Sequence, residues 1–392
     1  MDISDFLEPI DLREFPGTGE STGQARLGNM IRIYSDAADF PDFTTFDIAL
    51  IGVTDDRNAV NNAGCGLAPD VIRKYLYKLN AGPHPNKLVD LGNIRTGHSV
   101  SDTYFALAST VAEMVSNNVV PVILGGSQDM TFANYQAYQS LGQIINIVAI
   151  DPTFDLGRSE QELGAQSYLS SIILNQPNYL FNYANIGYQT YFVDQDALKL
   201  MKNLFFDTYR LGIVHENIGE VEPIVRNADM LSVDITAIRN SDAPGNGNAS
   251  PNGFYGEEAC QIIRYAGLSD KLTSIGFYEV NPAFDPTGQT SHLVAQMIWY
   301  FIDGYYGRAN DFPFKREEDY LKYRVSISDH KEEIVFYKSK KTDRWWMEIP
   351  LPMEQRIKYE RHYLVPCSYR DYQTACENDI PDRWWMVYQK LM

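Results

Sequence analysis

Short apolar segments alternate with longer helical patterns from about residue 46 onward. The segment "FDIALIGV" (46–53) precedes the helix-like "APDVIRKYLYKL" (68–79), and "VVPVILGG" (119–126) leads to "MTFANYQAYQSLG" (130–142). Near-continuous apolar strands separated by helices are typical of a parallel sheet with helices on both faces. We therefore expect an α/β fold of three αβα layers with a mostly parallel central sheet. Ligands bind such sheets at the carboxyl ends of the strands, so the polar residues there are the candidates for a functional site.

Residues 311–392 differ from the rest of the chain in composition. They are rich in aromatic and charged side chains, and "YRVSISDHKEEIVFYKSKKTDRWWMEI" is typical of β-hairpins joined by polar turns. The pentapeptide "DRWWM" occurs twice there, at 343–347 and 382–386. We expect three parts: an N-terminal extension (1–45), the α/β domain (46–310) and an aromatic-rich C-terminal extension (311–392).

The net charge of −18 is unevenly placed along the chain. Residues 311–392 carry 15 basic and 15 acidic side chains, which leaves 18 basic against 36 acidic ones in residues 1–310. The excess of acidic side chains in residues 1–310 repels nucleic acid and anionic lipid. We therefore expect neither nucleic-acid binding nor membrane insertion. The acidic start lacks the layout of a signal peptide, and the four cysteines show no metal-ligand spacing. These features favour a cytoplasmic protein with reduced thiols.

Four of the expected strands end in polar signatures. They are "LGGSQDMTF" (124–132), "AIDPTFDLG" (149–157), "LSVDITAIRNSDAPGNGNASPNGF" (231–254) and "YEVNPAFD" (278–285). In order and framing they resemble the motifs GGDHS, DAHxD, SxDxDxxDP and ExNP of the ureohydrolase family, which includes arginase, agmatinase and formimidoylglutamase. The resemblance implies the arginase-like fold. The segments "QSYLSSIIL" and "NIGYQTYF" lean towards the formimidoylglutamase-like branch.

In that family the motifs supply two His and four Asp ligands to a pair of Mn ions. By resemblance, three aspartate ligands are kept in this chain, as Asp151, Asp155 and Asp234. The other three ligand positions hold Gln128, Thr153 and Thr236. The resemblance also implies a substrate pocket that contains Glu279, which in the family helps to hold the guanidinium-like group. We expect Asn246, Asn248 and Asp129 in the same pocket.

The loss of both imidazoles and one carboxylate bears on the cofactor. Manganese and zinc sites usually include nitrogen ligands, and two adjacent cations need dense negative charge around them. We therefore expect no cofactor, with the aspartates held by hydrogen bonds as relics of a metal site. Since Gln128, Thr153 and Thr236 are oxygen donors, the alternative is one hard cation, Ca²⁺, Mg²⁺ or Na⁺. Mn is expected only if the chain is an active enzyme.

Two functions from different classes follow, and the lost metal ligands favour the first of them. The first is a pseudoenzyme that serves as a scaffold or ligand sensor and binds a protein partner through its C-terminal extension. Trp and Arg dominate interface hot spots, so the partner-binding candidates are Trp345, Trp346, Trp384 and Trp385. The plainer interpretation of the repeats is a duplicated strand that anchors the extension onto the body. The second function is a metal-dependent hydrolase of C–N bonds in linear amidines. The resemblance also implies a homo-oligomer.

Overall fold

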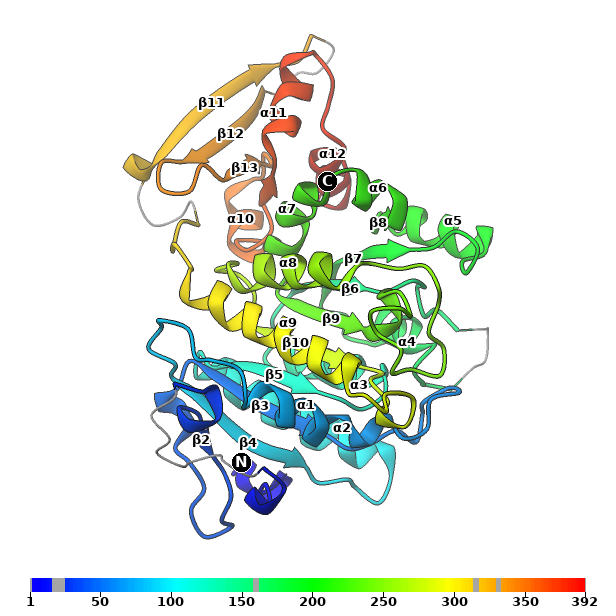
Figure 1. The fold of residues 1–392 in the computed structure, drawn as a ribbon. Helices are drawn as coiled ribbons and strands as arrows, with labels where there is room; N and C mark the ends of the chain where they lie inside the picture. Colours follow the sequence, from blue (N-terminus) through cyan, green and yellow to red (C-terminus); the bar gives the residue numbers. More distant parts are fainter. Residues whose placement is uncertain (1, 16–24, 158–161, 313–316, 329–332, 392) are drawn as a thin grey trace.

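The structure of the chain is a computed structural model that describes residues 2–15, 25–157, 162–312, 317–328 and 333–391. Its centre is one large, mostly parallel sheet, which has ten strands within the described residues (Figure 1). In this sheet β1 (Leu7–Glu8) runs antiparallel to its neighbour β4 (Leu88–Ile94), and the other pairs are parallel. The predicted fold class is therefore confirmed.

The order of the strands decides which loops meet. In space they run β1, β4, β3 (Ile48–Val53), β5 (Val120–Leu124), β10 (Ser274–Tyr278), β9 (Met230–Asp234), β6 (Ile145–Ile150), β7 (Leu180–Tyr188) and β8 (Asp207–Arg210), with β2 (Arg32–Ile33) also paired to β4. The polar signatures predicted from the sequence follow β5, β10, β9 and β6, which are consecutive neighbours at the centre of the sheet. Parallel direction places their carboxyl ends at one edge.

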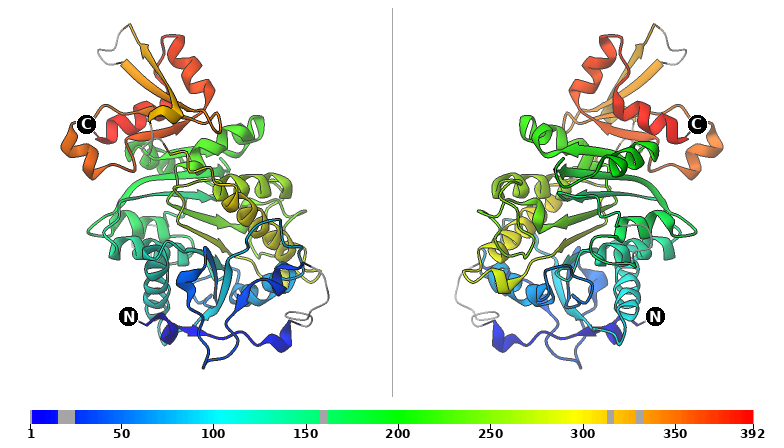
Figure 2. Two further views of the ribbon diagram at one scale, coloured as in Figure 1. Left: turned by 90° about the vertical axis from the view of Figure 1, so that its left-hand side faces the viewer. Right: turned by 90° about the vertical axis from the view of Figure 1, so that its right-hand side faces the viewer.

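Helices cover both faces of the sheet (Figure 2). Successive side chains of a strand point to opposite faces, so Ile48 and Leu50 of β3 pack in one core cluster and Ala49 and Ile51 in another. The helices are α1 (Ala68–Leu76), α2 (Val100–Ser116), α3 (Met130–Ser140), α4 (Tyr168–Leu174), α5 (Gln195–Asn203), α6 (Leu211–Glu216), α7 (Val221–Arg226), α8 (Gly256–Gly267) and α9 (Gln289–Tyr306). Of these, α1, α7, α8 and α9 cover the first face and α2 and α3 the second. Within the described residues, no helix is both long and apolar enough to cross a membrane.

The residues that follow α9 form a C-terminal module at one end of the molecule (Figure 1). Its strands β11 (Tyr320–Ser326), β12 (Glu333–Ser339), β13 (Trp345–Glu348) and β14 (Leu364–Cys367) make a second, antiparallel sheet. Its helices are α10 (Met353–Lys358), α11 (Tyr369–Cys376) and α12 (Asp382–Leu391). The N-terminal residues instead add β1 and β2 to the main sheet. The predicted division at residues 45 and 310 stays a prediction.

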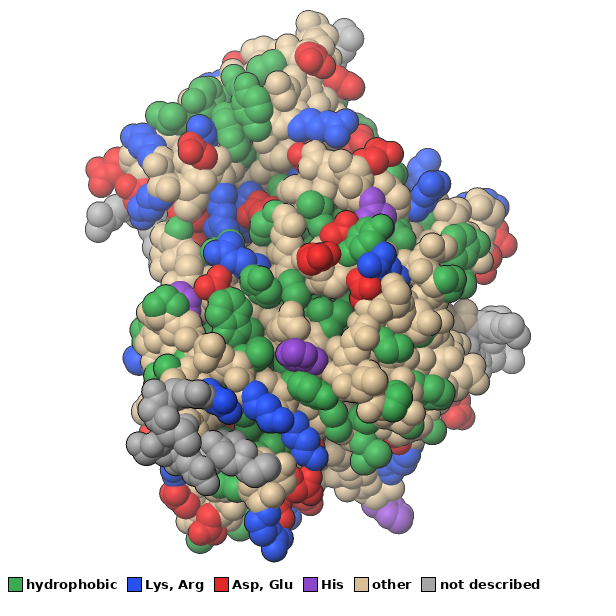
Figure 3. Space-filling view, viewed as in Figure 1, with side chains coloured by type: hydrophobic (Ala, Val, Ile, Leu, Met, Phe, Trp, Pro, Cys, Tyr) green, Lys and Arg blue, Asp and Glu red, His purple; other side chains and the backbone are tan. Residues whose placement is uncertain are grey.

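Basic side chains join the C-terminal module to the body. The guanidinium carbon of Arg226, at the end of α7, lies 4.4 Å from the centre of the Trp346 ring, an arrangement that favours cation–π attraction. Arg361 of the module donates two hydrogen bonds to the buried carboxylate of Asp229. Although burial opposes ionisation, Lys271 and Arg361 hold the pKa of Asp229 below its usual value. Basic and acidic side chains lie next to each other along this junction in Figure 3.

The tryptophans of the two DRWWM copies lie mostly inside the protein. Trp345, Trp346 and Trp384 are 7%, 1% and 1% exposed, whereas Trp385 is 37% exposed. The prediction that these residues bind a partner is therefore wrong for the first three, because their rings fill the interior of the module and its contact with the body. The interpretation of the repeats as a duplicated strand is also wrong, since the second copy lies in α12. A partner-binding role of Trp385 stays a prediction.

Candidate active site

The carboxyl ends of four neighbouring strands bring together the predicted polar residues. Asp151 follows β6, Asp234 ends β9 and Glu279 follows β10. After β5 the chain turns through Gly125 and Gly126, whose φ angles are +78° and +76°. Residues other than glycine rarely adopt these backbone angles, and a Cβ at Gly125 would lie 2.8 Å from Pro69. This turn carries Gln128 to the edge where the acidic residues meet.

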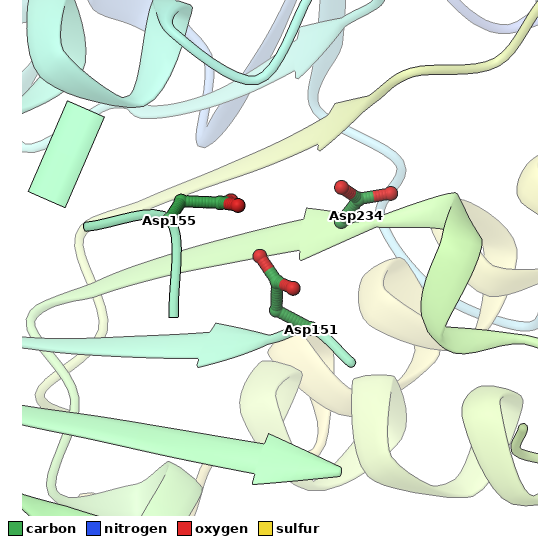
Figure 4. A group of neighbouring side chains, drawn as sticks. All are labelled: Asp151, Asp155 and Asp234. Atoms are coloured by element: carbon green, nitrogen blue, oxygen red, sulfur yellow. The ribbon is translucent and has the colours of Figure 1, made fainter. Parts of the chain in front are cut away.

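Three buried carboxylates form the centre of the site. Asp151, Asp155 and Asp234 each offer an oxygen, and these atoms all lie within 4.8 Å of one another. Figure 4 shows the three side chains converging from the end of β6, the loop after it and the end of β9. Residues that replace expected ligands hold these carboxylates. Thr153 donates from its backbone nitrogen to Asp151 at 2.7 Å, and the Thr236 hydroxyl donates to Asp234 at 2.6 Å.

Burial makes these acids hard to ionise. Desolvation, followed by repulsion from neighbouring carboxylates, raises the pKa of Asp234 to about 7 and that of Glu279 to about 8. Desolvation also raises the pKa of Asp155 to about 7 and that of Asp151 well above its ordinary value. Close carboxylates that lack a counter-charge have this effect on each other. A cation at their centre would remove the repulsion and return all of them to the charged form.

Glu279 is fixed beside the cluster by hydrogen bonds from two other loops. The backbone nitrogen of Gln128 donates to one of its carboxylate oxygens at 2.8 Å, and Asn62 donates to the other at 2.7 Å. Glu279 has a φ of +66° and Asp155 one of +48°, both in the left-handed region. Non-glycine residues there carry backbone strain, which clusters at functional sites. The surrounding contacts therefore keep Glu279 and Asp155 in backbone conformations that these residues would not adopt in an unconstrained loop.

The side-chain amide of Gln128 is oriented by the protein. Its nitrogen donates to the Ser232 hydroxyl at 3.0 Å, and that hydroxyl also bonds to Thr131 at 2.7 Å. The amide oxygen of Gln128 is buried without a hydrogen-bond partner, and so is one carboxylate oxygen of Asp151. Buried oxygens without partners are costly unless something binds them. The Gln128 amide oxygen and the three carboxylates make an all-oxygen donor set, which fits a divalent ion of the Mg²⁺, Ca²⁺ and Mn²⁺ group.

A cavity of about 300 Å³ opens over the carboxylates. Its lining includes Asp155, Asp234, Glu279, Gln128, Thr153, Thr236 and Asn248, all of which the sequence predicted for the site. Two predicted pocket residues do not line it. Asn246 is buried and donates to the carbonyl oxygen of Glu279 at 2.6 Å, so it supports the wall. Asp129 is buried among Tyr104, Ser127 and Asn58, to which it is hydrogen-bonded.

Several functional residues were not predicted from the sequence. Asn62 orients Glu279, and the lining of the cavity also includes Val60, Gln166, Phe192 and Ser250. Asn62 lies in the loop "NAVNNAGCG" after the strand at 46–53. Its Asn–Asn pair was the available signal, because side-chain amides often bind backbone groups in loops. The other residues carry no distinctive pattern.

Comparisons with known proteins agree with this geometry. The model of the arginase family matches residues 46–303. The chain is similar to formimidoylglutamase of Photorhabdus laumondii, 25% identical over 302 residues that span 72% of this chain and 94% of that protein. It is also similar to formimidoylglutamase of Staphylococcus aureus strain JH9, 27% identical over 267 residues, 65% of this chain and 85% of that protein.

Solved structures share the fold at lower identity. The formimidoylglutamase of Bacillus subtilis is 20% identical, with a TM-score of 0.65 over 76% of this chain and 99% of that chain. Trypanosoma cruzi formiminoglutamase, solved with Mn²⁺₂, is 18% identical, with a TM-score of 0.64 over 73% of this chain and 99% of that chain. At this identity the structures show a common fold.

These relatives correct the cofactor prediction. The expectation of no cofactor, or of a single Ca²⁺, Mg²⁺ or Na⁺ ion, is contradicted by a related fold that is solved with Mn²⁺₂ and by the three carboxylates that converge in this chain. The prediction gave too much weight to the missing imidazoles, because carboxylate, carbonyl and water oxygens also suit Mn²⁺. The expected loss of catalysis is likewise unsupported, since the relatives are named as enzymes.

Proposed function

The chain belongs to the arginase family, and we propose that it is a Mn²⁺-dependent hydrolase that cleaves a C–N bond in a linear amidine of the formimidoylglutamate type. The observation that carries the proposal is the convergence of Asp151, Asp155 and Asp234 beneath a cavity that Glu279 also lines. The names of the relatives supply the substrate class. This activity replaces the non-catalytic role that we expected from the sequence.

In the proposal, Asp151, Asp155 and Asp234 hold manganese, and the free amide oxygen of Gln128 is a further ligand. When bound, Mn²⁺ supplies Lewis-acid activation of water near neutral pH. The protein keeps the aspartates in place through Thr153 and Thr236, which donate to them from backbone and hydroxyl groups. Ligands oriented in this way by hydrogen bonds bind metal more tightly than free ones.

Glu279 serves in the proposal as the anchor for the substrate. An amidinium is a planar cation with parallel N–H groups, which match the two oxygens of a carboxylate. Gln128 and Asn62 fix the plane of the Glu279 carboxylate, so it presents one orientation to the cavity. A cationic substrate also favours the charged form of Glu279, whose pKa burial raises to about 8. Overall, one water adds to the amidine carbon and one C–N bond breaks, giving an amide and an amine.

The direct test is turnover by the purified full-length protein with Mn²⁺. We expect formamide release from formimidoylglutamate, loss of that release after metal removal with a chelator, and its recovery when Mn²⁺ is added back. Arginine and agmatine serve as competing substrates of the same class, with urea as the product to measure. If the protein retains Mn²⁺ but releases neither product from any of the three, the proposal is wrong.

The raised pKa values predict how Mn²⁺ binding depends on pH. Without metal, protons on Asp155, Asp234 and Glu279 stabilise the folded state below their unfolded pKa values of about 4, and this stabilisation is lost as pH rises through about 7 to 8. Mn²⁺ must displace these protons, so its binding strengthens with pH. The rise in melting temperature caused by Mn²⁺ should therefore be larger at pH 8 than at pH 6. A rise that is equal at both values would contradict the assignment.

We also propose a cytoplasmic location. The four cysteines are free thiols; Cys65, Cys260 and Cys367 are buried, and Cys376 is exposed. Free thiols are typical of proteins from reducing compartments, which supports the proposal. Blocking the accessible thiol in freshly extracted protein with a maleimide measures its redox state. A single labelled cysteine, Cys376, is the expected result.

A further inference from the structure

A second cavity, of about 420 Å³, lies at the carboxyl ends of β7 and β8. Its lining includes two arginines, Arg210 and Arg239, with His215 and the rings of Tyr188, Tyr191 and Tyr255. We call it the arginine pocket. It lies at the edge of the sheet that also holds the carboxylates, but none of its lining residues lines their cavity. The proposed hydrolysis makes no use of it.

Contacts hold one of the two guanidinium groups in place, and the other belongs to an exposed side chain beside the pocket. The guanidinium carbon of Arg239 lies 3.9 Å from the centre of the Tyr255 ring, and its Nε donates to Asp242 at 2.9 Å. The Arg210 side chain extends over Gly212. A Cβ added to Gly212 would lie 3.6 Å from Nη2 of Arg210. Tyr255 and Gly212 both line the pocket, so the two charged groups lie at its wall. Arg239 is therefore already ordered and loses little freedom when it binds a ligand.

Within the described residues, the acidic side chains beside the pocket pair with only part of its basic side chains. Asp242 pairs with Arg239, and Glu258 bonds to His215 at 2.9 Å. Among the described residues, no carboxylate pairs with Arg210. An arginine without a partner stands out in a body with 18 basic and 36 acidic side chains. Arginine forks match the oxygens of carboxylate and phosphate groups, and such hydrogen bonds are among the strongest in proteins.

We propose that the arginine pocket binds a small oxyanion, a carboxylate or a phosphate, through Arg210 and Arg239. The tyrosine rings contact the apolar part of the molecule that carries the oxyanion. The lining of the neighbouring cavity contains no basic side chain among the described residues. The two cavities nevertheless share a wall. Gln189, which lines the arginine pocket, donates from its backbone nitrogen to the carbonyl oxygen of Pro152, next to Asp151.

Calorimetric titration of the full-length protein with inorganic phosphate, succinate and benzoate tests the proposal and separates the two sources of oxyanion. We expect saturable binding of at least one of them. Arg210→Gln and Arg239→Lys should each weaken it about tenfold or more, because each removes a charge-assisted or forked contact. Arg324→Gln is the matched control, since Arg324 is an exposed arginine on β11 and should leave the affinity unchanged.

A second variant separates this site from the metal centre. Oxyanions also bind Mn²⁺, so the titration is repeated with Asp234→Asn, which alters the carboxylate cluster and leaves the arginine pocket intact. Retained affinity in that variant supports the proposal even if the protein shows no hydrolase activity. No heat from any of the three anions at about 10 mM, equal affinity in both arginine variants and the wild type, or affinity lost only in Asp234→Asn would each overturn it.

Discussion

Asp234→Asn should lower the rate of amidine hydrolysis at least about 100-fold and remove most of the bound Mn²⁺. Loss of a residue that only supports a metal ligand already lowers metal affinity or activity about 10–100-fold, and Asp234 is proposed as a ligand itself. The asparagine oxygen can still accept the hydrogen bonds that Thr236 donates from its backbone nitrogen and hydroxyl. The local fold after β9 is therefore preserved while one carboxylate charge is lost. Metal analysis and steady-state kinetics on the same preparation measure both effects.

The melting temperature of the metal-free variant distinguishes loss of a metal ligand from unfolding of the protein. Burial raises the pKa of Asp234 to about 7, so the metal-free protein gains little from this carboxylate at neutral pH. The melting temperature of metal-free Asp234→Asn should therefore equal or exceed that of the metal-free wild type. Asp303→Asn is a suitable control, because Asp303 is a partly buried aspartate of α9 that pairs with Arg264 outside the cavity lining. Wild-type Mn²⁺ content and turnover in Asp234→Asn would refute the metal site.

Trp346→Ala should lower the free energy of unfolding by about 3–5 kcal/mol, the usual cost of removing a buried large aromatic side chain. Trp346 is 1% exposed, and its ring lies edge-on to Tyr320 and beneath the Arg226 guanidinium. The substitution leaves a cavity and also removes the cation–π contact that joins the C-terminal module to α7. Denaturant unfolding followed by tryptophan fluorescence and circular dichroism measures the loss.

The second DRWWM copy supplies a matched control in the same chain. Trp385 occupies the position equivalent to Trp346 but is 37% exposed, and its ring stacks on Tyr388 of the same helix. Trp385→Ala should therefore lower the free energy of unfolding by less than about 1 kcal/mol. Equal losses in the two variants would show that the structure assigns the burial of these rings incorrectly.

Much of the fold was predictable because burial on both faces leaves a strong pattern. The segment 46–53 contains β3 (Ile48–Val53), and 119–126 contains β5 (Val120–Leu124), as apolar runs of strand length predict. The edge strand β8 (Asp207–Arg210) was missed, since its "DTYR" is polar and half exposed. Edge strands have one neighbour and less buried area, so their sequences are less constrained.

The candidate site was predictable where a residue follows a central strand. Asp151 and Glu279 directly follow β6 and β10, Asp234 is the last residue of β9, and the parallel strands bring the three residues together. Sequence could not show that Asp129 points away from the cavity or that Asn62 orients Glu279, because the Asn62 contact joins residues 217 positions apart. Contacts at such separation depend on how the whole sheet is assembled.

The two DRWWM copies separate what sequence decides from what the tertiary structure decides. By itself, the sequence determined the parallel sheet and the acidic residues at its edge, because these follow from apolar periodicity and from residues next to it. The Trp-Trp-Met part of the repeat lies in strand β13 in the first copy, whereas all five residues of the second copy lie in helix α12. Local preference is identical in both, so only the surroundings differ: β13 pairs with β12 and β14, whereas Asp382 begins a helix whose Trp384 packs inward. Packing free energy exceeds the small differences in intrinsic propensity, and the tertiary structure makes the choice.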